Sequence, residues 1–205
     1  MKYAKMLGLL AVAAAALMAF AGSASATTLT ITNPPGTKVV APAHTPIVAH
    51  AVGETILDGT VNIKCKKSLV EGETENEGSS STTVKGPLSK LTFEECGANT
   101  VTVVNKGSLE IHTDSATADG NGTLTSTGAE VTVLTHNILG TVHCIYITNE
   151  TDVGTLDGST KTGGTATLTV DSVPIPRAST DFGCGSTSEW TAHYTITSPD
   201  WLDVD

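Results

Sequence analysis

Aromatic residues are scarce in this chain of 205 residues, at 4% of the composition. Discounting Tyr3 and Phe20 near the start, only six remain: Phe93, Tyr146, Phe182, Trp190, Tyr194 and Trp201. Sugar-binding β proteins usually stack pyranose rings on exposed aromatic side chains. Trp190 and Tyr194 share the apolar face of one expected strand, so we expect both in the core. Trp201 is then the one ring expected at the surface, so a carbohydrate site would have only this aromatic side chain to stack against a sugar.

Basic residues are also few. The chain has 11 Lys and Arg against 21 Asp and Glu, and beyond residue 26 nine basic residues face 21 acidic ones, a formal charge of −12. Such a charge repels phosphate backbones and anionic lipid surfaces, which argues against nucleic acid and membrane surfaces as partners. A solvated surface explains the same charge without any partner.

Several catalytic, metal-binding and anchoring motifs are absent. The chain has no CxxC pair and no GxSxG motif, and no two histidines are spaced i, i+2. After the first 26 residues no apolar run is long enough to span a bilayer, and the C-terminal residues carry no apolar tail. We therefore predict no catalytic residue, no metal site, no cofactor and no membrane anchor.

The first 26 residues have the organisation of an export signal. Lys2 and Lys5 precede an apolar run from Leu7 to Phe20, and Ser23–Ala26 supplies the small residues that a signal peptidase recognises. We expect cleavage before Thr27. The protein is then secreted and extracellular, or periplasmic if its source has an outer membrane.

Residues 27–205 are expected to form a single β domain. No helical periodicity is present. Apolar and polar residues instead alternate with period two in segments such as 28–32, 100–103, 109–112, 131–133, 167–170 and 190–197. Asp58-Gly59, Asn105-Lys106-Gly107 and Thr127-Gly128 are expected to be hairpin turns. The proline-rich stretch from Asn33 to Pro46 should run along an edge. The pattern predicts an all-β antiparallel sandwich or barrel with disulfides.

One acidic segment breaks the alternation. The stretch at about 70–84 is polar and rich in Gly, Ser and Glu, which predicts a mobile loop. Glu71, Glu73, Glu75 and Glu77 occupy every second position, so an extended chain would place four carboxylates along one edge. Such an edge is either a weak calcium ladder or a solvated, self-repelling loop, and the composition favours the loop.

Four cysteines, Cys65, Cys96, Cys144 and Cys184, follow the expected signal. In an oxidising compartment thiols pair, and four cysteines allow three connectivities. We favour Cys65–Cys96 and Cys144–Cys184, because in each pair the first cysteine ends an expected strand and the second follows a long polar excursion. Zinc is the less favoured use of these residues.

A family resemblance rests on six short motifs. They are Leu91-Thr92-Phe93-Glu94-Glu95-Cys96, Gly107-Ser108-Leu109-Glu110-Ile111-His112, Gly122-Thr123-Leu124-Thr125-Ser126, Glu130-Val131-Thr132-Val133, Cys144-Ile145-Tyr146 and Trp190-Thr191-Ala192-His193-Tyr194. Together they resemble secreted Thr/Gly-rich all-β proteins of soil actinobacteria over most of residues 60–200. The resemblance implies a fold and carries no activity. Such relatives often have further cysteines near Thr100 and Thr135, which fits the loss of one bridge here.

Other residue groups are possible sites, and each has a plain structural explanation. The groups are the six histidines at 44, 50, 112, 136, 143 and 193, a partial calcium loop (Asp114, Asp119, Asn121), two serines beside a cysteine (Ser186, Ser188), three strand carboxylates (Glu110, Glu130, Glu189) and threonine arrays at 28–32, 123–127 and 165–169. The histidines, the calcium loop and the threonine arrays lack the spacing that their chemistry requires, the disulfide explains the loop that holds the two serines, and the three carboxylates form a pair only if their strands are neighbours.

These observations favour a secreted, non-enzymatic β-sandwich protein with a binding or cell-surface structural role. Its partner is unknown, with a cell-surface glycan or protein as the class considered. The alternative is an extracellular carbohydrate-active enzyme or lectin, which a cleft holding two or three carboxylates beside an exposed Trp would support.

Overall fold

The computed structural model describes residues 27–33, 37–60, 62–79, 82–113, 120–137, 140–159, 164–179, 183–199 and 201–205. Within these ranges the regular structure consists of β-strands, and no helix is long and apolar enough to cross a bilayer. The predicted all-β antiparallel fold is therefore confirmed. The expected export signal, residues 1–26, lies outside the described residues.

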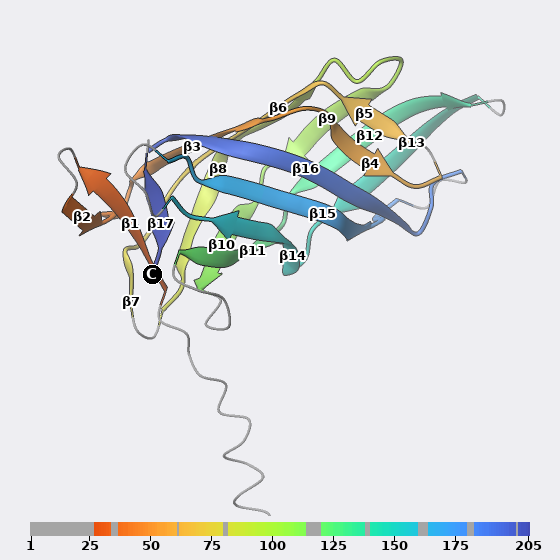
Figure 1. The fold of residues 1–205 in the computed structure, drawn as a ribbon. Helices are drawn as coiled ribbons and strands as arrows, with labels where there is room; N and C mark the ends of the chain where they lie inside the picture. The colour runs from red at the N-terminus through yellow and green to blue at the C-terminus, as the bar shows by residue number, and fades with distance from the viewer. Residues whose placement is uncertain are drawn as a thin grey trace, which may run out of the picture.

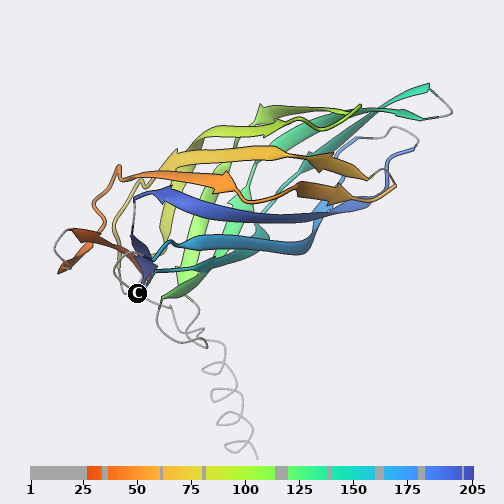
Figure 2. The same ribbon diagram turned by 45° about the horizontal axis from the view of Figure 1, so that its top comes forward.

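Eight strands close into an antiparallel ring (Figure 1, Figure 2). They are β3 (Pro46–Ala51), β6 (Lys67–Glu73), β8 (Val84–Glu94), β10 (Ser108–Thr113), β11 (Asn121–Thr127), β14 (Thr151–Asp157), β15 (Thr167–Pro176) and β16 (Thr187–Ser198). The ring runs β15-β14-β11-β10-β8-β6-β3-β16, and the pairing of β15 with β16 closes it. Of the two predicted architectures, the chain adopts the barrel.

Five further strands lengthen this ring at one end, on the right in Figure 1. They are β4 (Thr55–Asp58), β5 (Ile63–Cys65), β9 (Thr100–Asn105), β12 (Glu130–Asn137) and β13 (Gly140–Ile147). β4 follows β3 and pairs with β5, which leads into β6. β9, β12 and β13 form a three-stranded sheet that repeats the order of β10, β11 and β14. The result is an elongated barrel.

Two of the three expected hairpin turns are wrong. The chain continues in one direction from β9 to β10 through Gly107, and from β11 to β12 through Gly128. Gly107 has a φ of +70° and Gly128 a φ of +74°, and a Cβ on Gly107 would lie 2.4 Å from the backbone nitrogen of Ala129. These glycines therefore mark a kink within two paired strands, since positive φ serves bulges as well as turns. Asp58-Gly59 does join two antiparallel strands, β4 and β5, as predicted.

A small sheet covers the other end of the barrel. It contains β1 (Thr27–Asn33), β2 (Thr37–Val40), β7 (Gly78–Ser79) and β17 (Leu202–Val204), with β1 between β17 and β2. β2 belongs to the proline-rich stretch and lies at the edge, as expected for that stretch. Leu29, Leu202 and Val204 are buried, and Lys38 Nζ lies 2.5 Å from the Asp203 carboxylate. This hydrogen bond raises the pKa of Lys38 above its usual value.

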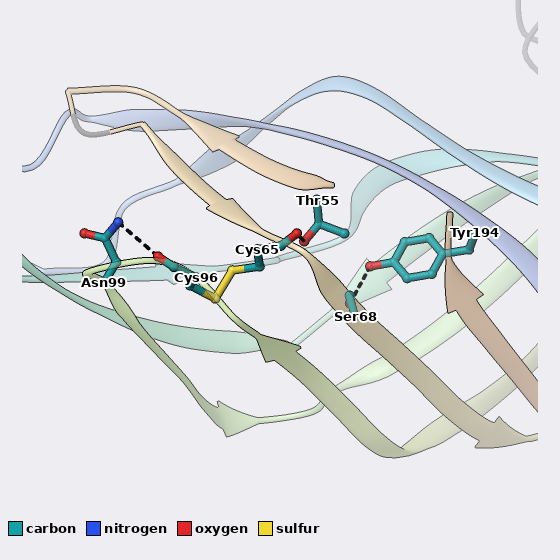
Figure 3. Close-up of a disulfide and its surroundings, with 6 residues drawn as sticks. All are labelled: Thr55, Cys65, Ser68, Cys96, Asn99 and Tyr194. Carbon is teal, nitrogen blue, oxygen red and sulfur yellow. Dashed lines mark hydrogen bonds between the residues drawn. A yellow bond between two sulfur atoms is a disulfide. The ribbon is translucent and has the colours of Figure 1, made fainter. Parts of the chain in front are cut away.

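The inner face of β16 follows the predicted alternation. Ala192, Tyr194 and Ile196 are buried, and His193 on the outer face is exposed. The Tyr194 hydroxyl lies 2.9 Å from Ser68 Oγ of β6, so this contact links two strands of the barrel wall that have β3 between them (Figure 3). Burial raises the pKa of Tyr194 to about 12, so the phenol stays neutral and able to donate.

Both predicted disulfides are present, Cys65–Cys96 and Cys144–Cys184. Cys65 ends β5 and Cys96 follows β8 (Figure 3), while Cys144 lies in β13 and Cys184 precedes β16. Both bridges therefore lie toward the end of the barrel that is away from β1 and β17. Two disulfides are consistent with an extracellular location.

The acidic segment expected at about 70–84 is more ordered than its composition suggests. Residues 70–73 belong to β6, a strand of the barrel wall, and β7 at 78–79 pairs with β1. Asn76 receives a hydrogen bond from the Lys85 backbone and donates one to the Thr83 carbonyl oxygen, so the segment has contacts of its own. Glu71 and Glu73 lie on a half-buried strand, and the positions that alternate with them, Val70 and Gly72, face inward. The mobility of residues 74–83 stays a prediction.

The contact between Tyr194 and Ser68 gives a test of the barrel wall. We expect Tyr194→Phe to lower the free energy of unfolding by about 1–3 kcal/mol, because it leaves the buried Ser68 hydroxyl without this partner. Ser68→Ala should cost a similar amount, and the double variant should cost clearly less than the two single variants together. Urea unfolding measures all three, and additive losses would show that the hydroxyls are not coupled.

Candidate functional site

The barrel contains a cavity of about 100 Å³, which we call the lumen. Its lining residues come from β4 to β6 and from β8 to β16, and they include Leu57, Val70, Leu91, Val101, Val131 and Ile175. No charged side chain lines it among the described residues. Several of its apolar side chains, Trp190 among them, are only half-buried although they point inward.

A second cavity of about 70 Å³ adjoins the lumen on the side of the covering sheet. The two share Val70, Leu88, Leu109, Leu124 and Leu168 as lining residues. Leu202 of β17 lines the second cavity and is fully buried, so the covering sheet contributes to its wall. The two cavities are therefore neighbours, and the lining of the second also includes the charged residues Glu73 and Lys85.

The scarcity of aromatic residues explains why this space is not filled. An eight-stranded barrel has an interior just wide enough for side chains to fill or for one small ligand. Here most inward positions carry Val, Leu or Ile, and some carry smaller residues such as Ser126 and Ala129. Only a few large rings point inward, so volume remains along the axis.

Three hydroxyl groups around the lumen, those of Thr55, Ser126 and Thr148, are hydrogen-bonded within the protein. Ser126 Oγ lies 2.9 Å from Thr148 Oγ1, which also accepts a hydrogen bond from the Ala129 backbone nitrogen at 3.0 Å. Thr55 Oγ1 donates to the Cys65 carbonyl oxygen at 3.4 Å (Figure 3). In contrast to these hydroxyl groups, Trp190 Nε1 is buried and has no hydrogen-bond partner among the described residues.

The candidate histidines are not gathered into a site. His44 Nδ1 lies 3.4 Å from Glu73, His112 Nε2 lies 4.0 Å from Glu110, and both pairs are on the outer surface. Across the parts of the chain that the structure covers, no group of three His, Cys, Asp or Glu side chains could hold a metal ion.

The three candidate carboxylates lie on strands that are not neighbours, namely β10, β12 and β16 for Glu110, Glu130 and Glu189. Glu189 instead lies opposite Asp58 of β4, and both are exposed. The pair of carboxylates beside an exposed Trp that would support a sugar-cleaving site is therefore not assembled from these residues, and Trp201 is half-buried rather than exposed.

The remaining candidates are dispersed. Ser188 is buried in β16 and Ser186 is exposed before it. The threonine arrays fall on or beside β1, β11 and β15, which do not pair with one another. Asp114 and Asp119 lie outside the described residues, as does Phe182.

Comparison with protein-family models, curated proteins and solved structures finds no match to this chain. The resemblance to secreted actinobacterial proteins therefore stays a prediction. The candidate site is therefore defined by its own geometry, a lumen lined mainly by apolar side chains.

The geometry of the acidic segment predicts its response to calcium. Glu71 lies 3.6 Å from Lys90 and Glu73 lies 3.4 Å from the His44 ring, so two of the four carboxylates already have a side-chain partner. We expect millimolar calcium to leave the melting temperature unchanged. Replacing Glu71, Glu73, Glu75 and Glu77 by glutamine should also have little effect, because exposed charges contribute weakly.

Thermal unfolding with and without calcium checks this expectation, and magnesium serves as the control ion. A calcium-specific rise in melting temperature, with protection of residues 74–83 from a Glu-specific protease, would instead make the segment a metal site.

Proposed function

We propose that this protein is an extracellular, non-enzymatic binding protein that holds a small apolar molecule in its lumen. The observation that carries the proposal is the hollow barrel interior, whose lining has no charged side chain among the described residues. Ligand sites of proteins are mostly apolar cavities with a few placed polar groups, and this lumen has that composition. An apolar molecule would leave water and cover side chains that are now only half-buried.

The size of the lumen limits the ligand. An engineered apolar cavity of about 150 Å³ is enough to bind benzene. The lumen of about 100 Å³ with its neighbour of about 70 Å³ suits a single ring or a short alkyl chain. A sugar fits this proposal poorly, since its hydroxyl groups would lose water without gaining partners on the apolar walls. The carbohydrate alternative therefore has less support than the apolar ligand.

Secretion belongs to the same proposal. The apolar run between Leu7 and Phe20, the small residues before Thr27 and the two disulfides all support export. The resemblance to secreted Thr/Gly-rich proteins of soil actinobacteria supports it as well. The acidic surface supports a protein that binds neither nucleic acid nor anionic membranes.

The export proposal predicts the mature chain. We expect material recovered from the culture medium of an expressing host to begin at Thr27, with a mass that fits loss of residues 1–26 and two disulfides. Intact-mass measurement with N-terminal sequencing tests this expectation. Extracellular protein that retains Met1 would contradict it.

The binding proposal predicts stabilisation by small apolar molecules. A ligand at about 100 times its Kd stabilises a protein by about 2.7 kcal/mol, which corresponds to a rise in melting temperature of roughly 5–10 °C for a domain of this size. Screening single-ring and short-chain compounds by thermal unfolding should find such ligands, and sugars should give no shift.

Two Val→Phe variants in β9 test whether the ligand binds in the lumen. Val101 lines the lumen, whereas Val104 is 59% exposed on the outside. Val101→Phe should fill the lumen and abolish the ligand-induced shift, while Val104→Phe should leave it intact. Unfolding of each variant without ligand shows that it is folded. Equal ligand shifts in both variants would move the site out of the lumen and overturn the proposal.

A further inference from the structure

One stretch of the barrel wall lacks hydrogen bonds between neighbouring strands, and we call it the seam. It separates residues 89–94 of β8 from residues 100–106, which contain β9. On its other side β8 pairs with β6, and β9 pairs with β12. Within residues 82–113, all of which the structure describes, β8 and β9 do not pair with each other. The two strands therefore face each other with unpaired backbone edges.

The kink at Gly107 accounts for the seam. After Gly107 the chain continues as β10, whose residues 108–111 pair with residues 84–87 of β8. Before Gly107 the chain runs as β9, which follows β12 instead. Since Gly107 has a positive φ, the strand changes direction between these two segments. The kink thus separates β9 from β8 and leaves the edges of both strands free.

Both ends of the seam are fastened. At one end the Leu88 backbone nitrogen donates a hydrogen bond to the Gly107 carbonyl oxygen at 3.0 Å. At the other end the turn at 95–99 connects the two strands, and Cys96 in this turn is bonded to Cys65 (Figure 3). The Asn99 side chain also donates to the Cys96 carbonyl oxygen at 3.4 Å (Figure 3). Only the strand segments between these two points are free to separate.

Lumen side chains on both sides of the seam are open to solvent. Leu88, Leu91 and Phe93 of β8 and Val101 of β9 line the lumen, and each is only half-buried. Half-buried lining residues also occur on β4, β6, β10, β12 and β16. On β11, β14 and β15 the lining residues are instead buried, namely Leu124, Ser126, Val153, Leu168 and Ile175. The lumen is thus sealed on the side of these three strands and partly open beside the seam.

The seam is also the part of the wall that opens at the lowest cost. Entry between two paired strands would break backbone hydrogen bonds, and the separated groups would lose their partners. The covering sheet closes one end of the barrel, where Leu202 is buried beside the second cavity. Between β8 and β9 a small molecule passes without breaking a hydrogen bond of the sheet. The side chains that it meets there are apolar, as is the proposed ligand.

From these observations we infer that the ligand enters and leaves the lumen sideways, through the seam between β8 and β9. This inference rests on the proposed function and adds the route to its site. Because the seam is fastened at both ends, the strands separate locally while the barrel stays folded. The width to which they separate then limits the size of molecules that reach the lumen, in addition to the volume of the lumen itself.

A cross-link over the seam tests this route. Thr92 of β8 and Thr102 of β9 lie on its two sides, and neither lines the lumen. In the full mature protein both are replaced by cysteine, and the new thiols are joined by the shortest bis-maleimide that spans them. Maleimides leave the two native disulfides intact. Exchange of fluorobenzene, a single-ring probe, is followed by ¹⁹F NMR, which gives the association and dissociation rates.

Matched controls isolate the effect of the tether. His112 of β10 and Thr123 of β11 lie directly opposite each other on paired strands, and neither lines the lumen. The same replacement and the same reagent cross-link this pair. The seam variant with each thiol blocked by N-ethylmaleimide shows the effect of the substitutions alone. Lys90 and Val104, both exposed, supply a second cross-link over the seam if the first variant does not fold.

We expect the seam cross-link to lower the association and dissociation rates by about tenfold or more, since it raises the barrier to passage in both directions. The Kd should stay the same, because a route changes both rates by the same factor. The cross-link between β10 and β11 and the blocked thiols should leave both rates unchanged.

The outcomes distinguish the route from the proposed function. If fluorobenzene binds and the seam cross-link leaves its rates unchanged, or if both cross-links slow it equally, the ligand uses another route and the inference is wrong. If Val101→Phe leaves the binding of fluorobenzene unchanged, or if no single-ring or short-chain compound binds, the proposed function fails and the inference fails with it.

Discussion

Closure of the sheet between β15 and β16 is the constraint on which the rest of this structure depends. Once eight antiparallel strands form a ring, alternate residues of every strand must face one common interior. The circumference then fixes the space inside, and the size of the inward side chains decides whether that space is filled. With Val, Leu and Ile at most inward positions and few aromatic rings, the ring closes around a cavity. Closure also removes the exposed edges that an open sheet of this length would present.

Period-two alternation was sufficient to predict the fold class, because it reports directly which residues face the same side of a strand. It placed Ala192, Tyr194 and Ile196 together on the inner face of β16, where they are buried. The sequence reading failed where the same local signal occurs in two different structures, such as a turn and a kinked strand. Gly107 and Gly128 have the positive φ of turn residues, yet they kink continuous strands. Glu71 and Glu73 suggested a loop, although the inward positions of β6 beside them belong to the barrel wall.

The site was harder to predict than the fold. The scarcity of aromatic residues was visible in the sequence and argued against a sugar platform, but its consequence for the barrel interior requires knowledge of which strands are neighbours. Pairing partners such as β10 with β8, or β16 with β3, are distant in sequence and leave no mark on local composition. Trp190 was correctly expected to point inward, whereas the absence of an acceptor for its Nε1 depends on the packing of Phe93 and Tyr194 around it. Both favoured disulfides were correct, although each closes a segment that contains two barrel strands, β6 and β8 or β14 and β15, rather than the polar excursion that the sequence suggested.

The antiparallel pairing of β1 with β17 has a mechanical consequence. Thr28 and Asp205 exchange two backbone hydrogen bonds, and Leu29 lies opposite Val204, so the two ends of the folded domain lie side by side. A pulling force applied between these ends acts across the strands and opens their bonds one after another, as a zipper opens. β17 would therefore detach at low force and uncover Leu202, which lines the second cavity, while the hydrogen bonds of the barrel carry no load. The covering sheet is thus the mechanically weak part of a domain whose barrel is cross-linked at the opposite end.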